Sequence, residues 1–210
     1  MENNFKKVIF FIYKNPLLLF LIFIFFLFLP ILFLKKLFPG FDLLLIFYPY
    51  SQHFLSQQSF WTSGILSGFN IGVTPNAFAG NWVYYFLANR VGLGLLDFIT
   101  FYNFLIFFYF ILTATFSYLV SRKLGFDKYV SVLVASVYIF SAYNLSWMVN
   151  IVTAASLFIF PAIIYFLLKF RDNFNWVWPI VGGTVLGLGL IVSHPQFALT
   201  GIFGWFLFSL

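Results

Sequence analysis

The sequence predicts an all-α integral membrane protein, a polytopic helical bundle of about six spans. Hydrophobic residues make up 63% of the chain and charged residues only 8%, with a mean hydropathy of +1.01, whereas a soluble domain carries roughly 25% charged residues. A water-soluble fold of 210 residues would have to bury 35 Phe and 12 Tyr with almost no charge to cover its surface. A bilayer supplies the apolar surroundings instead.

The first apolar run covers residues 16–34 and follows three lysines. It meets the ~20 residues that a span needs. It also exceeds the ~7–15 residues of a signal-peptide core, and no small-x-small cleavage site follows it. We therefore expect a transmembrane anchor that is retained.

Five further apolar runs are separated by short hydrophilic breaks. They cover residues 100–121, 129–147, 151–168 and 177–193, with a last run from residue 197. This last run is shorter than the ~20 residues of a span, and no basic residue follows it. We expect residues 1–210 to form a single transmembrane domain, the amino-terminal part of a longer protein.

The basic residues predict the orientation, because short cytoplasmic loops are rich in Lys and Arg. Eight of the eleven fall on one side of the predicted spans: Lys6, Lys7, Lys14, Arg122, Lys123, Lys128, Lys169 and Arg171. We expect the protein to lie in the plasma membrane, with this side and the amino terminus facing the cytoplasm. The net charge of +6 then reflects orientation rather than nucleic-acid binding.

Residues 40–99 are expected to form a long first outer loop that contains juxtamembrane helices. Within it, residues 82–98 are apolar enough to suggest another span. Arg90 and Asp97 would make that span a costly one, and an additional crossing would invert every later loop. We expect an interfacial or re-entrant helix there.

Asp42 is the candidate catalytic residue of this loop. It follows Phe38-Pro39-Gly40, where the first span leaves the membrane, and five apolar residues follow it. Apolar surroundings raise the pKa of a carboxyl group and suit it to general-base work. Alternatively, Asp42 starts an interfacial helix or pairs with Lys35 or Lys36.

Three further polar residues of the loop are candidate substrate-binding residues. Gln52 and His53 belong to the aromatic stretch YPYSQHF, a mixture that suits sugars but is also expected in an interfacial aromatic belt. Asn70 lies in a glycine-rich stretch, residues 64–80, whose composition is typical of a loop that bends closely around a ligand.

Arg90, His194 and Gln196 complete the set of candidate binding residues. A guanidinium such as that of Arg90 matches the geometry of a phosphate. His194 and Gln196 flank Pro195 at a predicted outer turn, where a histidine either contacts substrate or simply ends a helix.

Several classes of site are excluded. The chain has no cysteine, so disulfides and thiolate metal sites are ruled out. It has no Walker loop, no HExxH and no GxSxG, and its spans contain no chain of charges for an ion relay. This argues against an ATP-driven pump and, less strongly, against a secondary transporter.

Four segments follow one another along the chain: DLLLIFYPYSQHFL, SGILSGFNIGVTPNAFAGNWVYYF, ASVYIFSAYN and SHPQFAL. Their order resembles that of the YfhO-like bacterial membrane proteins, which are relatives of the GT-C glycosyltransferases. The resemblance implies a polyprenyl-phosphate-linked sugar donor and an acidic residue in the first outer loop. Asp42 matches that position, and the resemblance implies that it deprotonates an acceptor hydroxyl or binds a divalent cation.

The resulting hypothesis is a GT-C-type glycosyltransferase that moves a sugar from polyprenyl phosphate to a cell-envelope acceptor on the outer face. Membrane lipids and this donor are the expected partners. The alternatives are a lipid or solute transporter or flippase, in which the glycine-rich loop is a gate, and a non-catalytic scaffold for envelope assembly.

Overall fold

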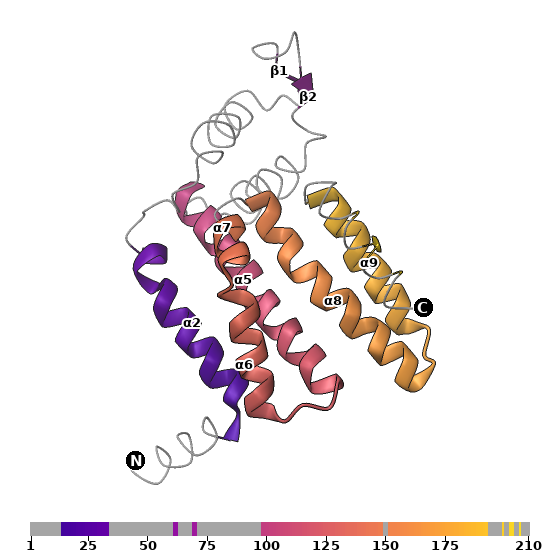
Figure 1. Ribbon diagram of the computed structural model, residues 1–210. Coiled ribbons are helices and arrows are strands. Elements are labelled where there is room, and N and C mark those ends of the chain that lie inside the picture. The colour runs from indigo at the N-terminus through magenta and orange to yellow at the C-terminus, as the bar shows by residue number, and fades with distance from the viewer. Residues whose placement is uncertain are drawn as a thin grey trace, which may run out of the picture.

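The structure is a computed structural model that describes residues 14–33, 61–62, 69–70, 98–148 and 151–192, with residues 199, 202, 203 and 206. Its described part is a bundle of helices (Figure 1). The helices are α2 (Pro16–Phe33), α5 (Phe98–Lys123), α6 (Lys128–Ile139), α7 (Ala142–Met148), α8 (Ile151–Asn173) and α9 (Val177–Val192). One short antiparallel pair joins β1 (Trp61–Thr62) to β2 (Phe69–Asn70).

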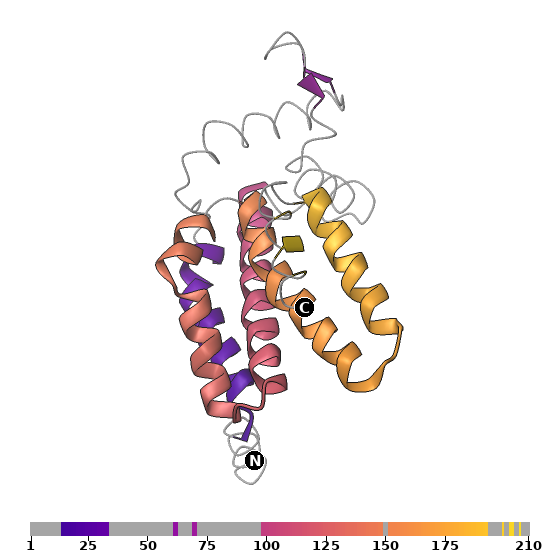
Figure 2. The ribbon, with the colours of Figure 1, turned by 45° about the vertical axis from the view of Figure 1, so that its right-hand side comes forward.

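Helix α5 is the centre of the bundle. Its 26 residues give a length of about 39 Å, and it packs against α2, α6 and α8. Helix α9 packs against α8 on the far side from α6 (Figure 2). The buried core therefore follows one face of α5, where Ile106, Phe110 and Ala114 are almost fully covered.

Helix α2 is apolar on all sides, yet only one of its faces is buried. Phe20, Ile24 and Phe28 recur every four residues and are buried, because a spacing of four places side chains on the same face of a helix. The ring of Phe28 packs against that of Phe110 with centroids 5.0 Å apart. Phe26, on another face, is 63% exposed.

Two described helices are long and apolar enough to cross a membrane, residues 16–33 in α2 and 103–123 in α5. The apolar segments 128–139 and 177–187 are shorter. A membrane crossing needs about 20 helical residues. The prediction of transmembrane helices is thus supported for two of the expected runs.

The predicted span 129–147 is wrong as a single helix. The structure divides it into α6 and α7, with a break at Phe140 and Ser141. The Oγ of Ser141 accepts a hydrogen bond from the backbone N–H of Asn144, and the Asn144 side chain donates to the carbonyl of Tyr138. These polar side chains satisfy backbone groups that helix ends leave open, so they favour a break over a continuous helix.

The helix ends that carry the basic residues of the described segments lie at one end of the bundle (Figure 1). We call this the basic end. The Nζ of Lys128 donates to the carbonyl of Lys14 at 3.2 Å, and the Nζ of Lys123 lies 2.7 Å from a carboxylate oxygen of Asp172. The basic end consists of Lys14, Arg122, Lys123, Lys128, Lys169 and Arg171.

Candidate functional site

Most of the predicted site residues lie outside the described residues. These are Asp42, Gln52, His53, Arg90, His194 and Gln196. Asn70 alone is described, and its backbone pairs with that of Trp61 across the short β ladder. Residues 69–70 of the glycine-rich stretch therefore form a short strand, while the rest of that stretch lies outside the described residues.

The helices that flank these residues have their adjoining ends at the same end of the bundle. Helix α2 ends at Phe33, α5 begins at Phe98 and α9 ends at Val192, all at the end of the bundle opposite the basic end (Figure 1). The segments that carry Asp42 and His194 are therefore connected to the same end.

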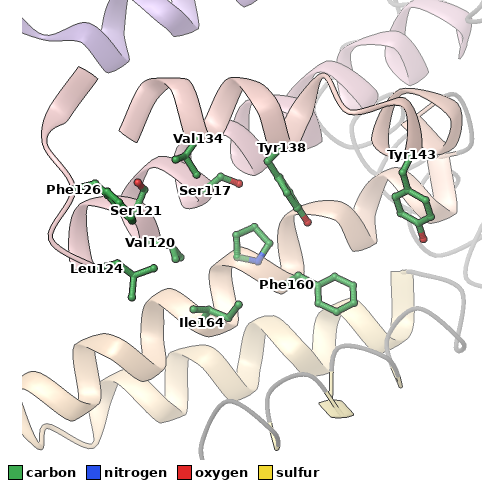
Figure 3. A pocket seen from close by; sticks show the side chains of 11 residues that line it. Ser117, Val120, Ser121, Leu124, Phe126, Val134, Tyr138, Tyr143, Phe160 and Ile164 are labelled. Atoms are coloured by element: carbon green, nitrogen blue, oxygen red, sulfur yellow. The ribbon is translucent and has the colours of Figure 1, made fainter. Parts of the chain in front are cut away.

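A cavity of about 570 Å³ lies between α5, α6 and α8 (Figure 3). Most of its wall is apolar. It extends from Leu124 and Phe126, beside the basic end, to Tyr143 of α7. Its residues are Ser117, Val120, Ser121, Leu124, Phe126, Val134, Tyr138, Tyr143, Phe160, Pro161 and Ile164.

Pro161 and Tyr138 explain one polar contact in this wall. Proline has no backbone N–H, so Pro161 inside α8 leaves the carbonyl of residue 157 without its usual helical partner. The hydroxyl of Tyr138 donates to that carbonyl, Leu157 O, at 3.3 Å. A side chain of α6 thus supplies the hydrogen bond that α8 lacks, and it links the two helices across the cavity.

We expect Tyr138→Phe to lower the free energy of unfolding by about 1 kcal/mol, because the Leu157 carbonyl loses its donor. In a Pro161→Ala background the alanine N–H restores the helical bond, and the same substitution should cost much less. The measurement is a double-mutant cycle of unfolding in mild detergent. Tyr129→Phe, which alters an exposed tyrosine, is the matched control, and an equal cost of Tyr138→Phe in both backgrounds would contradict the assignment.

Two carboxylates at the basic end are held ionised. Hydrogen bonds from the N–H groups of Val130 and Tyr129 lower the pKa of Asp127, which caps α6. The hydrogen bond from Lys123 lowers the pKa of Asp172 and joins the last turns of α5 and α8. Asp127 accepts hydrogen bonds from backbone N–H groups and Asp172 forms an ion pair with Lys123. The basic residues at this end outnumber the two acids, so the end carries a net positive charge.

Ser117 and Ser121 are the residues of this region that the sequence analysis missed. They lie four residues apart on α5 and both line the cavity. The available signal was a pair of hydroxyls at helical spacing inside an apolar run, which is also compatible with ordinary helix packing.

No cluster of three or more His, Cys, Asp or Glu that could hold a metal ion occurs among the residues that the structure describes. A scan against family models, a search of the curated proteins and a search of the solved structures each find no match for this chain.

Proposed function

We propose that the chain is a multi-spanning plasma-membrane protein that transfers a sugar from a polyprenyl-phosphate donor to a cell-envelope acceptor on the outer face. Asp42 is the proposed base or ligand of a divalent cation. Gln52, His53 and His194 are proposed to contact sugar or phosphate. In this proposal the GT-C-like character comes from the resemblance of the sequence segments.

The membrane location is supported by the apolar exterior of the bundle. Phe23 and Phe26 of α2, Leu133 and Val137 of α6 and Ile180 of α9 are all exposed. Soluble monomers rarely expose apolar surface on so many elements. Lipid tails would cover these side chains without cost.

One observation supports the proposed site: the basic residues and the helix ends that lead to the candidate residues lie at opposite ends of the bundle. By the positive-inside rule the basic end is cytoplasmic, so the candidate residues belong to the outer face. A donor anchored by a lipid tail is presented at such a face by the bilayer itself.

The test is product formation by the full protein in membranes that contain a polyprenyl-phosphate sugar with a labelled sugar. We expect label to move to an envelope acceptor only when the protein and the lipid-linked donor are both present. Movement of intact labelled donor between leaflets, with no new glycoside, would instead identify a flippase.

A further inference from the structure

Two serines that line the cavity between α5, α6 and α8 carry buried hydroxyl groups that have no partner among the described residues. Ser117 is 6% exposed and Ser121 is 2% exposed, and the Oγ atom of each makes no hydrogen bond there. A buried polar group without a hydrogen bond is costly, so each such group needs an explanation.

Hydroxyl groups elsewhere on α5 and α6 form hydrogen bonds within their own helices. Thr113 donates to the carbonyl of Tyr109 at 2.7 Å, and Ser136 donates to that of Val132 at 2.8 Å. This bond to the carbonyl four residues earlier is the usual choice of a serine or threonine inside an apolar helix. Ser117 and Ser121 depart from it on the wall of α5 that lines this cavity (Figure 3).

A basic side chain, that of Arg122, lies beside the cavity. Arg122 is exposed, and its Nη1 donates to the carbonyl of Phe126, a residue of the cavity wall, at 2.7 Å. This contact holds the guanidinium at the rim of the cavity and leaves other N–H groups for a phosphate. The nearby Asp127 carboxylate accepts two backbone N–H groups, and that of Asp172 is bound to Lys123.

These features match the parts of one molecule in their order along the axis of α5. Ser121 lies next to Arg122, and Ser117 lies one turn deeper, about 6 Å along the axis. The apolar wall then continues along α6 past Val134 to Tyr143. Helix α6 has 12 residues and is about 18 Å long, which slightly exceeds the depth of one leaflet of a ~30 Å hydrocarbon core.

We propose that this cavity binds one acyl chain of an anionic glycerophospholipid of the cytoplasmic leaflet. The phosphate contacts Arg122, the ester oxygens accept hydrogen bonds from Ser117 and Ser121, and the acyl chain lies between α6 and α8. The inference uses the membrane location proposed above but not the sugar transfer, which belongs to the opposite end of the bundle.

The test is lipid retention by the full protein. The protein is reconstituted in vesicles of equal parts phosphatidylcholine and phosphatidylglycerol, extracted in mild detergent and analysed by native mass spectrometry. We expect phosphatidylglycerol to be retained in preference to phosphatidylcholine. Loss of each serine hydroxyl should weaken that retention roughly 2- to 10-fold, the range for one hydrogen bond.

The variants separate the three parts of the proposed site. Ser117→Ala with Ser121→Ala removes both hydroxyls, Ile164→Trp fills the cavity from α8, and Arg122→Gln should abolish the preference for the anionic lipid. Ser136→Ala, whose hydroxyl is satisfied within its own helix, is the matched control and should retain lipid normally. Circular dichroism verifies that each variant is folded. If the double serine variant unfolds, Ile164→Trp and Arg122→Gln still decide the test.

Equal retention of the two lipids, or unchanged retention in the filled and hydroxyl-free variants, would overturn the proposal. Detection of a dimer that Ile164→Trp dissociates, with no lipid retained, would assign the cavity to a second copy of the chain and also overturn it. Extraction of the protein from membranes by alkaline carbonate would show that the membrane location itself is wrong.

Discussion

Asp42→Asn is expected to reduce sugar transfer by about 10²- to 10⁴-fold, the usual loss when a general base is removed. The substitution keeps the size and polarity of the side chain but removes the charge. Donor affinity should change little, because the proposed role of Asp42 is to act on the acceptor hydroxyl in the transition state. The measurement is the rate of product formation from a polyprenyl-phosphate sugar by the full protein.

Asp97→Asn is the matched control, because Asp97 is the other acidic residue of the predicted outer loop. It should leave the rate close to that of the unmodified protein. Unchanged turnover in Asp42→Asn would return Asp42 to the alternative role of helix start or ion-pair partner. Loss of turnover together with loss of the thermal transition would make Asp42 a structural residue.

Ile24→Ala is expected to destabilise the bundle by about 2 kcal/mol, near the lower limit for deletion of a large aliphatic core side chain. Ile24 is fully buried in the cluster that α2 forms with α5 and α6. Lipid tails are as apolar as the core, so the transfer free energy contributes little and the lost packing contributes most. The measurement is unfolding by a denaturing detergent, followed by circular dichroism.

Phe26→Ala is the control on the same helix. It deletes a larger side chain, but Phe26 is 63% exposed and should face lipid. We expect its effect on the free energy of unfolding to stay below about 0.5 kcal/mol, as for other substitutions outside the core. A larger loss for Phe26→Ala than for Ile24→Ala would mean that α2 packs through the other face.

This comparison also shows what the sequence could not predict. The run 16–34 has no polar residue to distinguish one face from another, so it predicts a helix and a possible span but no packing face. The buried face follows from the partner helices, which supply complementary aromatic surfaces such as that of Phe110. The start of α2 at Pro16 and its end near Phe33 agree closely with the predicted limits.

The helix ends were predictable where a local signal marks them. Gly125 ends the α5 segment with a φ of +94°, a conformation that favours glycine, and Asp127 caps α6. The break between α6 and α7 was missed because Ser141 and Asn144 are compatible with a helix interior as well as with caps. Two contacts distinguish the alternatives: the Ser141 Oγ accepts from the backbone N–H of Asn144, and the Asn144 side chain donates to the carbonyl of Tyr138.

The candidate sites differ in the same way. Asp42 and His194 were selected by residue type and position, and they stay predictions. Ser117, Ser121 and Tyr138 became notable only through the cavity that three helices form around them. Such a cavity depends on the packing of α5 with α6 and α8, which the hydropathy of the separate runs does not encode.

The central claim is that the basic end of the bundle faces the cytoplasm and that residues 40–99 face outward. Single cysteines test it directly, because the chain has none of its own. We expect Ser67→Cys to react with a membrane-impermeant maleimide in intact cells. Phe126 is exposed in the turn between α5 and α6 at the basic end, and we expect Phe126→Cys to react only after permeabilisation. Reaction of Phe126→Cys in intact cells, with Ser67→Cys protected until permeabilisation, would contradict the orientation and with it the outer-face site.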